Sequence, residues 1–128
     1  MKIQISRLDR KFSLYIRTRA NWTCERCGGR YTPPTNALHC SHFWGRARKK
    51  VRFDPDNAFA HCYGCHAYLG AHPEEFRRWA MSKLGIDRYN ALMLRANTLS
   101  SKPDYDLIEI WLDQELKKQV ITKKTRAN

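Results

Sequence analysis

The sequence predicts one α+β domain in which a short cysteine-rich core is flanked by helices. Two Cys-x-x-Cys pairs, Cys24/Cys27 and Cys62/Cys65, frame the middle of the chain. Apolar residues with helical spacing precede the first pair and follow the second, and short β-prone runs bounded by turn residues lie between them. The chain has 128 residues, the length of a single domain. We therefore expect one domain over residues 1–128, with its core at about residues 22–85.

The segment before the first cysteine pair predicts a helix at about residues 9–21. Phe12, Tyr15 and Ile16 follow the spacing of one helical face, and Asp9 is the expected N-cap residue. An apolar stripe of this kind marks the face of a helix that packs against a core.

The segment after the second cysteine pair predicts three helices, the last two at about residues 87–122. Pro73 suits the first turn of a helix, and Gly85 suits its end. Asp87 is the expected cap of a second, shorter helix, and Pro103 is the expected start of a third, longer one. The aromatic and methionine side chains of these helices fall on apolar stripes typical of core positions, and the lysine-rich end is expected to fray.

Two short strands are expected between the cysteine pairs. Leu38–Phe43 is apolar enough for the first strand, and Val51–Phe53 is the expected second strand. Residues 44–52 between them are expected to form a basic loop. The turn signal Asp54-Pro55-Asp56-Asn57 follows the second expected strand.

The four paired cysteines, Cys24, Cys27, Cys62 and Cys65, predict a structural zinc site. Each pair turns two sulfur atoms toward one point, and a tetrahedral zinc ion takes four thiolates in this arrangement. The alternative is four buried free thiols, which does not account for two such spacings in one short domain. We expect the fifth cysteine, Cys40, to be a small buried residue rather than a ligand.

Composition favours a nucleic-acid partner. Lys and Arg number 24 against 12 Asp and Glu, which leaves a formal net charge of +12. A basic domain of this size is typical of proteins that bind polyanions, although a merely soluble basic protein has the same composition. We find no secretory signal and no apolar stretch near the roughly 20 residues that span a bilayer, so we expect no membrane contact and a cytoplasmic chain. In that reducing compartment, paired cysteines bind metal rather than form disulfides.

The expected loop carries the densest group of cations in the chain. The group consists of Arg46, Arg48, Lys49, Lys50 and Arg52. Because no acidic residue lies among them, we predict that they bind a DNA phosphate backbone. The alternative is a solvated charged loop.

His42 is the candidate general base. An imidazole that titrates near neutrality takes a proton from a water molecule that attacks a phosphodiester, provided that the ring faces the same cleft as the metal. Asn57 is the candidate residue that holds the strand of the base in place, through hydrogen bonds from its amide to the loop backbone. For isolated residues, a satisfied strand histidine and a turn asparagine are the ordinary interpretations.

His66 directly follows the expected zinc ligand Cys65. This position places its ring close to the zinc but not on it. A second, catalytic metal held by His66 and His39 would polarise the scissile phosphate and stabilise the departing oxygen. The alternative is a hydrogen bond from His66 to the zinc site.

In this order the motifs resemble those of the HNH (ββα-metal) superfamily. The run Arg19-x-x-Trp22-Thr23-Cys24-x-x-Cys27-Gly28 resembles its entry, and Cys62-x-x-Cys65-His66 resembles its exit. More narrowly, Ser41-His42-Phe43 and Val51-Arg52-Phe53-Asp54-x-x-Asn57 are similar to motifs of the NinG (Rap) recombination endonucleases of lambdoid phages. The resemblance covers about residues 12–97, and the motifs are specific as an ordered set.

The resemblance implies an α+β fold with a zinc-stabilised ββα-metal (HNH) core and flanking helices. It also implies a DNA endonuclease that uses Mg²⁺ or Mn²⁺, leaves 5′-phosphate and 3′-hydroxyl ends, and acts on branched recombination intermediates. The expected setting is a bacterial cytoplasm, with a phage or prophage as the source. Two symmetric cuts at a junction are compatible with a homodimer.

Two positions depart from the family pattern. HNH enzymes usually place an acidic metal ligand before the base, whereas this chain has Ser41, so that either His39 takes that role or the metal has fewer protein ligands. Position 66 is His, as in the wider superfamily, rather than the Asn expected of the lambda-type proteins.

Two other classes of function stay open. One is a non-catalytic zinc-ribbon DNA-binding adaptor in phage replication or packaging. The other is an RNA-binding zinc protein, which the lack of an RNA-recognition motif disfavours.

Overall fold

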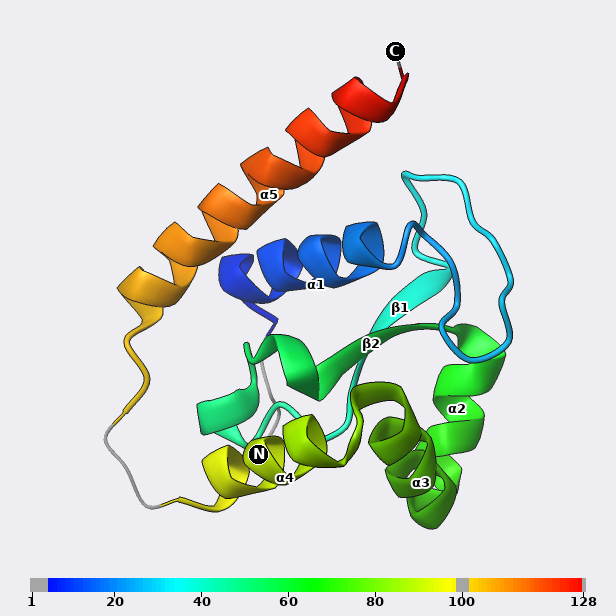
Figure 1. The fold of residues 1–128 in the computed structure, drawn as a ribbon, viewed down its shortest axis with the longest axis vertical. Coiled ribbons are helices and arrows are strands. Elements are labelled where there is room, and N and C mark those ends of the chain that lie inside the picture. Colours follow the sequence, from blue (N-terminus) through cyan, green and yellow to red (C-terminus); the bar gives the residue numbers. More distant parts are fainter. Residues whose placement is uncertain (1–4, 99–101, 128) are drawn as a thin grey trace.

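The computed structural model describes residues 5–98 and 102–127. These residues form a two-stranded antiparallel sheet and five α-helices, which confirms the α+β class (Figure 1). The elements are α1 (Arg7–Arg19), β1 (Leu38–His42), the 3-10 helices η1 (Lys49–Val51) and η2 (Pro55–Asn57), β2 (Ala58–Cys62), α2 (Tyr63–Ala71), α3 (Pro73–Leu84), α4 (Ile86–Asn97) and α5 (Tyr105–Ala127).

Helix α1 begins at Arg7, two residues before the predicted start at residue 9. Ser6 is its N-cap, because the Ser6 side chain accepts a hydrogen bond from the Asp9 N–H at 3.1 Å. The Asp9 carboxylate accepts in return from the Ser6 N–H at 2.8 Å. This is a capping box, which places the acid at the third helical position rather than at the cap. The prediction that Asp9 is the N-cap was wrong for this reason.

The predicted second strand at Val51–Phe53 was also wrong. Val51 lies in η1 and is fully buried, and Phe53 is buried in the loop that follows. The strand that pairs with β1 is β2, with Leu38 opposite Cys62 and His42 opposite Ala58. Residues 58–61 are buried on both faces of the sheet, so β2 lacks the alternation that marks a half-buried strand.

The sheet lies between two groups of helices. On one face, Phe12 and Ile16 of α1 pack with Cys40 of β1 and Ala58 of β2. On the other face, Phe59 of β2 packs against buried residues of α3 and α4. Helix α2 follows β2 without a loop and contacts both strands, so β1, β2 and α2 form a hairpin–helix unit (Figure 1).

The C-terminal helices agree with the predicted ones except at their ends. Helix α3 starts at Pro73, and Gly85 follows it with a φ of +82°, a left-handed conformation that suits glycine. The same Gly85 caps α4, so that Asp87 lies inside the first turn and is not the cap.

Helix α5 is longer than predicted and packs on α1 through the fully buried Leu112 (Figure 1). It continues to Ala127, whereas residues after about 122 were expected to fray. Across the described ranges, none of the helices combines the length and the apolar character that a membrane crossing needs.

Candidate functional site: a four-cysteine centre beside a histidine pair

The first cysteine pair lies in a tight turn between α1 and β1. Thr23 and Arg30 form an antiparallel bridge that closes this turn. Inside it, the Cys24 N–H donates to the Gly29 carbonyl at 2.8 Å, and the Gly28 N–H donates to the Cys24 carbonyl at 2.9 Å. Gly28 has a φ of +80°, which a side chain would strain. The turn therefore brings the sulfur atoms of the buried Cys24 and the exposed Cys27 to one side.

The second cysteine pair joins β2 to α2. Cys62 is the last residue of β2 and the N-cap of α2, and its sulfur accepts a hydrogen bond from the Cys65 N–H at 3.4 Å. Cys65 follows in the first turn of the helix and is buried. The start of α2 thus fixes the direction of both sulfur atoms.

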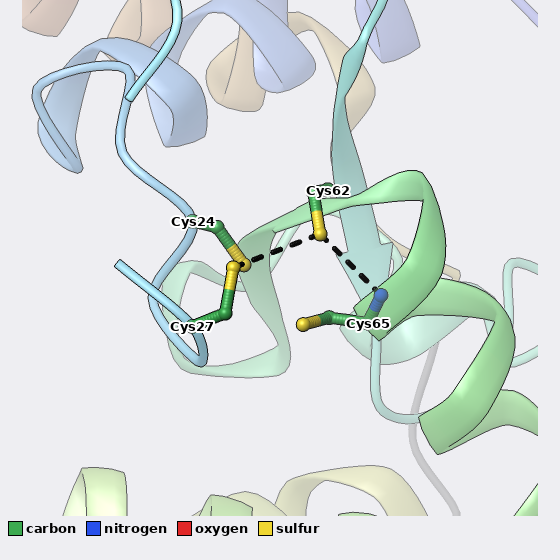
Figure 2. Close-up of side chains that lie close together, drawn as sticks. All are labelled: Cys24, Cys27, Cys62 and Cys65. Carbon is green, nitrogen blue, oxygen red and sulfur yellow. Dashed lines mark hydrogen bonds between the residues drawn. The ribbon is translucent and has the colours of Figure 1, made fainter. Parts of the chain in front are cut away.

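Glu25 holds the first pair against the second. Its N–H donates to the Ala60 carbonyl at 2.8 Å, and its carboxylate accepts from the Ala60 N–H at 2.7 Å. The four cysteine sulfur atoms consequently lie within 4.8 Å of one another, and those of Cys27 and Cys62 are 3.8 Å apart (Figure 2). Two sulfurs on one tetrahedral zinc, with Zn–S bonds of about 2.3 Å, are about 3.8 Å apart. The four cysteines therefore fit a zinc site.

The electrostatics of the four thiols also suit a cation. Burial opposes ionisation of Cys24, but the backbone N–H groups of Cys27, Cys62 and Arg26 outweigh it and lower the pKa of Cys24 to about 7. Burial, together with the neighbouring thiols, raises the pKa of Cys65 to about 12, although Arg26 donates to its sulfur at 3.4 Å. Ionisation of one thiol therefore makes ionisation of the next one less favourable. A divalent cation between the thiolates removes that repulsion.

Cys40 stands apart from this centre. It is 7 % exposed, faces α1, and burial raises its pKa to about 12. The expectation of a small buried residue is confirmed.

His39 and His66 meet beside the cysteine centre. His39 lies in β1, His66 lies in α2, and their Nδ1 atoms are 3.0 Å apart with the rings nearly perpendicular. Burial, followed by the adjacent His39 ring, lowers the pKa of His66. This separation is that of a hydrogen bond between the two rings. It is also close to the separation of about 3 Å between two imidazole nitrogens that bind one cation at about 2.0–2.1 Å each. In the part of the chain that the structure describes, no third His, Cys, Asp or Glu joins them in a ligand cluster.

His42 lies away from this pair, so the expectation that its ring faces the same cleft as the catalytic metal is not met in this structure. Residues three apart in a strand point to opposite faces, and the His42 ring packs on Phe12 of α1 at 5.7 Å between ring centroids. Its Nε2–H donates to the Arg52 carbonyl at 2.8 Å, while its buried Nδ1 has no hydrogen-bond partner among the described residues. Burial, followed by the charge of Arg46, lowers the pKa of His42 to about 4.

Ser41, between the two histidines of β1, is fully buried. Its hydroxyl oxygen has no hydrogen-bond partner within residues 5–98 and 102–127. It lies on the same face of β1 as His39, two residues away.

Asn57 joins the loop after β1 to the loop before β2. It is fully buried, and its side-chain oxygen accepts from the Trp44 N–H at 2.7 Å. Its NH₂ group donates to the carbonyls of Trp44 and Val51, both at 2.9 Å. The amide therefore fixes the backbone directly after His42, as the sequence suggested.

The basic loop is partly neutralised by an acid that is distant in sequence. Arg52 binds Asp9 of α1 through two hydrogen bonds of 3.0 and 2.7 Å, and Arg46 lies 3.6 Å from the same carboxylate. Asp9 is only 3 % exposed. Its burial opposes ionisation, but Arg52 and Ser6 outweigh this and lower its pKa.

The other three cations of the loop differ in their surroundings. Arg48 stacks on Trp44 at 4.4 Å and donates to the Ala96 carbonyl at 3.2 Å. Lys49 is exposed and Lys50 is half-buried. Neither lysine side chain has an ion pair or hydrogen bond to a described residue, so these two are placed to meet an external anion.

Two further residues, Asp9 and His61, lie near this site and had no predicted functional role. Asp9 binds the loop, but its sequence signal is only that of a helix start. His61, opposite His39 in the sheet, is fully buried, and neither ring nitrogen has a hydrogen-bond partner among the described residues. It packs between Phe76 and Trp79, and burial lowers its pKa to about 3. Nothing in the sequence separates such a core histidine from a ligand.

Comparisons with protein-family models, curated proteins and solved structures found no match for this chain. The fold and the site themselves define an α+β domain in which the turn after α1 and the hairpin–helix unit each supply two of four cysteines that fit zinc.

Proposed function

We propose that this chain is a metal-dependent DNA endonuclease of the HNH type. The observation that carries the proposal is the hairpin–helix unit β1–β2–α2. It brings His39 and His66 to 3.0 Å beside the four-cysteine centre, with His42 at the end of β1 and Asn57 directly before β2. A site of this composition suits hydrolysis of a phosphodiester bond.

His42 has the tautomer that a general base needs. Its Nε2 proton is held by the Arg52 carbonyl, so the lone pair of the neutral ring is on Nδ1, which has no described partner. Nδ1 is covered and the ring faces α1, so His42 can act on a phosphate bound at His39 and His66 only after the ring and the side chains around it move. Asn57 then keeps the backbone after His42 in place during that movement.

His39 and His66 are the residues that would hold the catalytic metal, Mg²⁺ or Mn²⁺. A divalent cation bound there supplies Lewis-acid polarisation of the phosphate and stabilises the leaving oxygen. With two protein ligands, water and phosphate oxygens would complete the coordination; because Mg²⁺ prefers oxygen ligands, two imidazole nitrogens suit Mn²⁺ better.

The substrate is proposed to be DNA bound along the loop after β1. The net charge of +12, and the lack of an ion-pair partner for Lys49 and Lys50 among the described residues, support a phosphate-binding role. Branched recombination intermediates are the proposed substrates within that class.

A non-catalytic zinc protein that binds DNA is the second candidate. The observation that favours it is the placement of His42, whose ring faces α1 rather than His39 and His66. In that case His42 is a buried packing residue, and the loop alone acts on DNA.

Nicking of supercoiled plasmid by the zinc-loaded chain separates the two candidates. The endonuclease nicks only with Mg²⁺ or Mn²⁺, and His42→Ala lowers the rate by about 10²–10⁴ while DNA binding persists. The matched control is His72→Ala, at an exposed histidine that follows α2, which leaves the rate unchanged. DNA binding without metal-dependent nicking by the unmodified chain identifies the adaptor instead.

A further inference from the structure

Arg26 lies between the two cysteines of the first pair and reaches across to the second pair. Its Nη1–H group donates a hydrogen bond to the sulfur of Cys65 in α2 at 3.4 Å, across 39 residues of sequence. Cys65 is only 6 % exposed, whereas Arg26 is an exposed residue. A charged donor therefore reaches a buried sulfur of the four-cysteine centre from the solvent side.

The guanidinium group of Arg26 is held in this position by residues of α2 and α3. It stacks on the ring of Tyr68 at 4.6 Å, and the Tyr68 hydroxyl donates to the carboxylate of Glu75 at 2.7 Å. The Tyr68 ring also stacks with the ring of His72, at 4.1 Å between the centroids. Because the stack already orders the planar guanidinium, the bond to the sulfur of Cys65 requires little further loss of side-chain entropy.

The charge of a zinc-loaded centre explains the use of a cation here. Four thiolates and one Zn²⁺ leave a net charge of about −2. Burial makes that charge unfavourable, and Cys24 and Cys65 are both buried. A hydrogen bond from a charged donor to a thiolate is stronger than one from a neutral donor, and it offsets part of the charge. The bond to Cys65 also raises the pKa of Arg26 above its usual value, so the arginine stays charged beside the sulfur.

We propose that Arg26 is a positioning residue of the zinc centre, which retains zinc by orienting the Cys65 thiolate and neutralising part of its charge. Groups that hydrogen-bond a metal ligand typically contribute about 10–100-fold to metal affinity. Because Arg26 is exposed and solvent screens its charge, we expect a contribution of about 10-fold. This inference rests on the fit of the four cysteines to zinc and not on the proposed nuclease activity.

The alternative is that Arg26 only fastens the first cysteine turn to the rest of the fold. Its neighbour Glu25 already does this, through two hydrogen bonds to the backbone of Ala60 and through Lys83 of α3, whose Nζ lies 3.5 Å from the Glu25 carboxylate. None of these Glu25 contacts involves a cysteine sulfur. The contact that Arg26 adds is the one to the sulfur of Cys65.

Competition between the full chain and a chromophoric zinc chelator at constant pH measures the zinc affinity. Arg26→Met should lower it about 10-fold. The matched control, Arg30→Met, removes the same charge at an exposed residue of the same turn and should leave the affinity unchanged. Arg26→Lys keeps the charge and an N–H donor, so it should recover part of the loss. Tyr68→Leu leaves Arg26 in place but removes its stack, and should lower the affinity by a smaller factor.

The absorption spectrum of the Co²⁺-loaded chain tests the contact itself. A hydrogen bond to a thiolate stabilises the sulfur lone pair. Its loss in Arg26→Met should therefore move the sulfur-to-cobalt charge-transfer band to longer wavelength, whereas Arg30→Met should leave the band in place. If Arg26→Met does not fold at saturating metal, Tyr68→Leu provides the same two measurements.

Three results would overturn the proposal. The first is an unchanged zinc affinity in Arg26→Met, or in Tyr68→Leu where that variant takes its place. The second is an equal loss of affinity in Arg30→Met, which would show that net charge and not the hydrogen bond retains the metal. The third is a loss of affinity without a shift of the cobalt band, which would show that Arg26 only supports the fold.

Discussion

At the scale of single residues, Asp9 joins helix α1 to the loop that follows β1. Its carboxylate binds Arg52, and the carbonyl of Arg52 accepts the Nε2 proton of His42. The ion pair therefore holds the backbone group that orients the proposed base. Sequence reasoning assigned Arg52 to DNA, because the acid that binds it lies 43 residues earlier in the chain.

Replacement of Asp9 by Asn should destabilise the chain by about 2–3 kcal/mol, because the half-buried Arg52 loses its charged partner. Chemical denaturation measures this difference, and Asp87→Asn, at an exposed acid of α4, serves as the control without effect. Since the pKa of Asp9 is below its usual value of 3.8, the ion pair contributes fully above that pH. The difference between the unmodified chain and Asp9→Asn should therefore shrink as the pH falls below 3.8, and a difference independent of pH would count against the ion pair.

The pH dependence of cleavage reports on His42. Burial lowers its pKa to about 4, so the ring stays neutral, and able to accept a proton, well below the usual value of 6.5. The acid limb of the cleavage rate should accordingly lie nearer pH 4 than pH 6.5. The lowered pKa also reduces the stability of the fold between pH 6.5 and pH 4, because the unfolded chain binds more protons there than the folded chain. Rates should therefore be measured at pH values where the fold persists. A limb centred at pH 6.5 would point to another base.

At the scale of elements, Cys62 has two structural roles, as the end of β2 and as the N-cap of α2. Metal analysis should find one tightly held zinc per chain, and Cys62→Ser or removal of zinc by a chelator should unfold the hairpin–helix unit. Cys40→Ala is the matched control, since Cys40 is buried but lies outside the four-cysteine cluster. It should keep the zinc at a small cost in stability. A metal-free chain with an unchanged circular dichroism spectrum and melting temperature would refute the zinc site.

The helices and the cysteine centre were predictable because their signals are local. Pro73 and Gly85 mark the ends of α3 by their own backbone preferences, and the cysteine spacing alone brings two sulfurs together. Strand β2 was not predictable in this way, because it is buried on both faces and its pattern lacks alternation. The exposure of Leu107 and Ile110 on α5 was not predictable either, since an apolar residue in a sequence does not reveal whether the fold covers it.

The placement of the three candidate histidines depended on the fold rather than on the motif. Pairing of β1 with β2, followed directly by α2, brings His39 to His66. The alternation of side chains along β1 sends His42 to the other face, towards Phe12. The sequence order of the motif contains neither piece of information.

At the scale of the whole molecule, the net charge of +12 predicts DNA binding governed by counterion release. Lys49→Glu/Lys50→Glu should weaken binding equally for all sequences and reduce the log–log salt slope by about 2, because phosphate contacts carry no base information. The control variant is Arg30→Glu/Arg78→Glu, which changes the net charge by the same amount at exposed residues of the first cysteine turn and of α3. Binding titrations at several salt concentrations measure both slopes. If the two variants lost DNA affinity equally, the net charge of the protein and not the loop would account for binding.

The rate of plasmid nicking as a function of Mn²⁺ concentration tests the central proposal most directly, when the unmodified chain is compared with His66→Ala. Both proteins should hold zinc and bind DNA, since His66 is outside the four-cysteine cluster. The account predicts a rate that saturates with Mn²⁺ for the unmodified chain, and a rate lowered at least about 10²-fold, at every metal concentration, for His66→Ala. Absence of metal-dependent nicking by the unmodified chain, or identical curves for the two proteins, would contradict it.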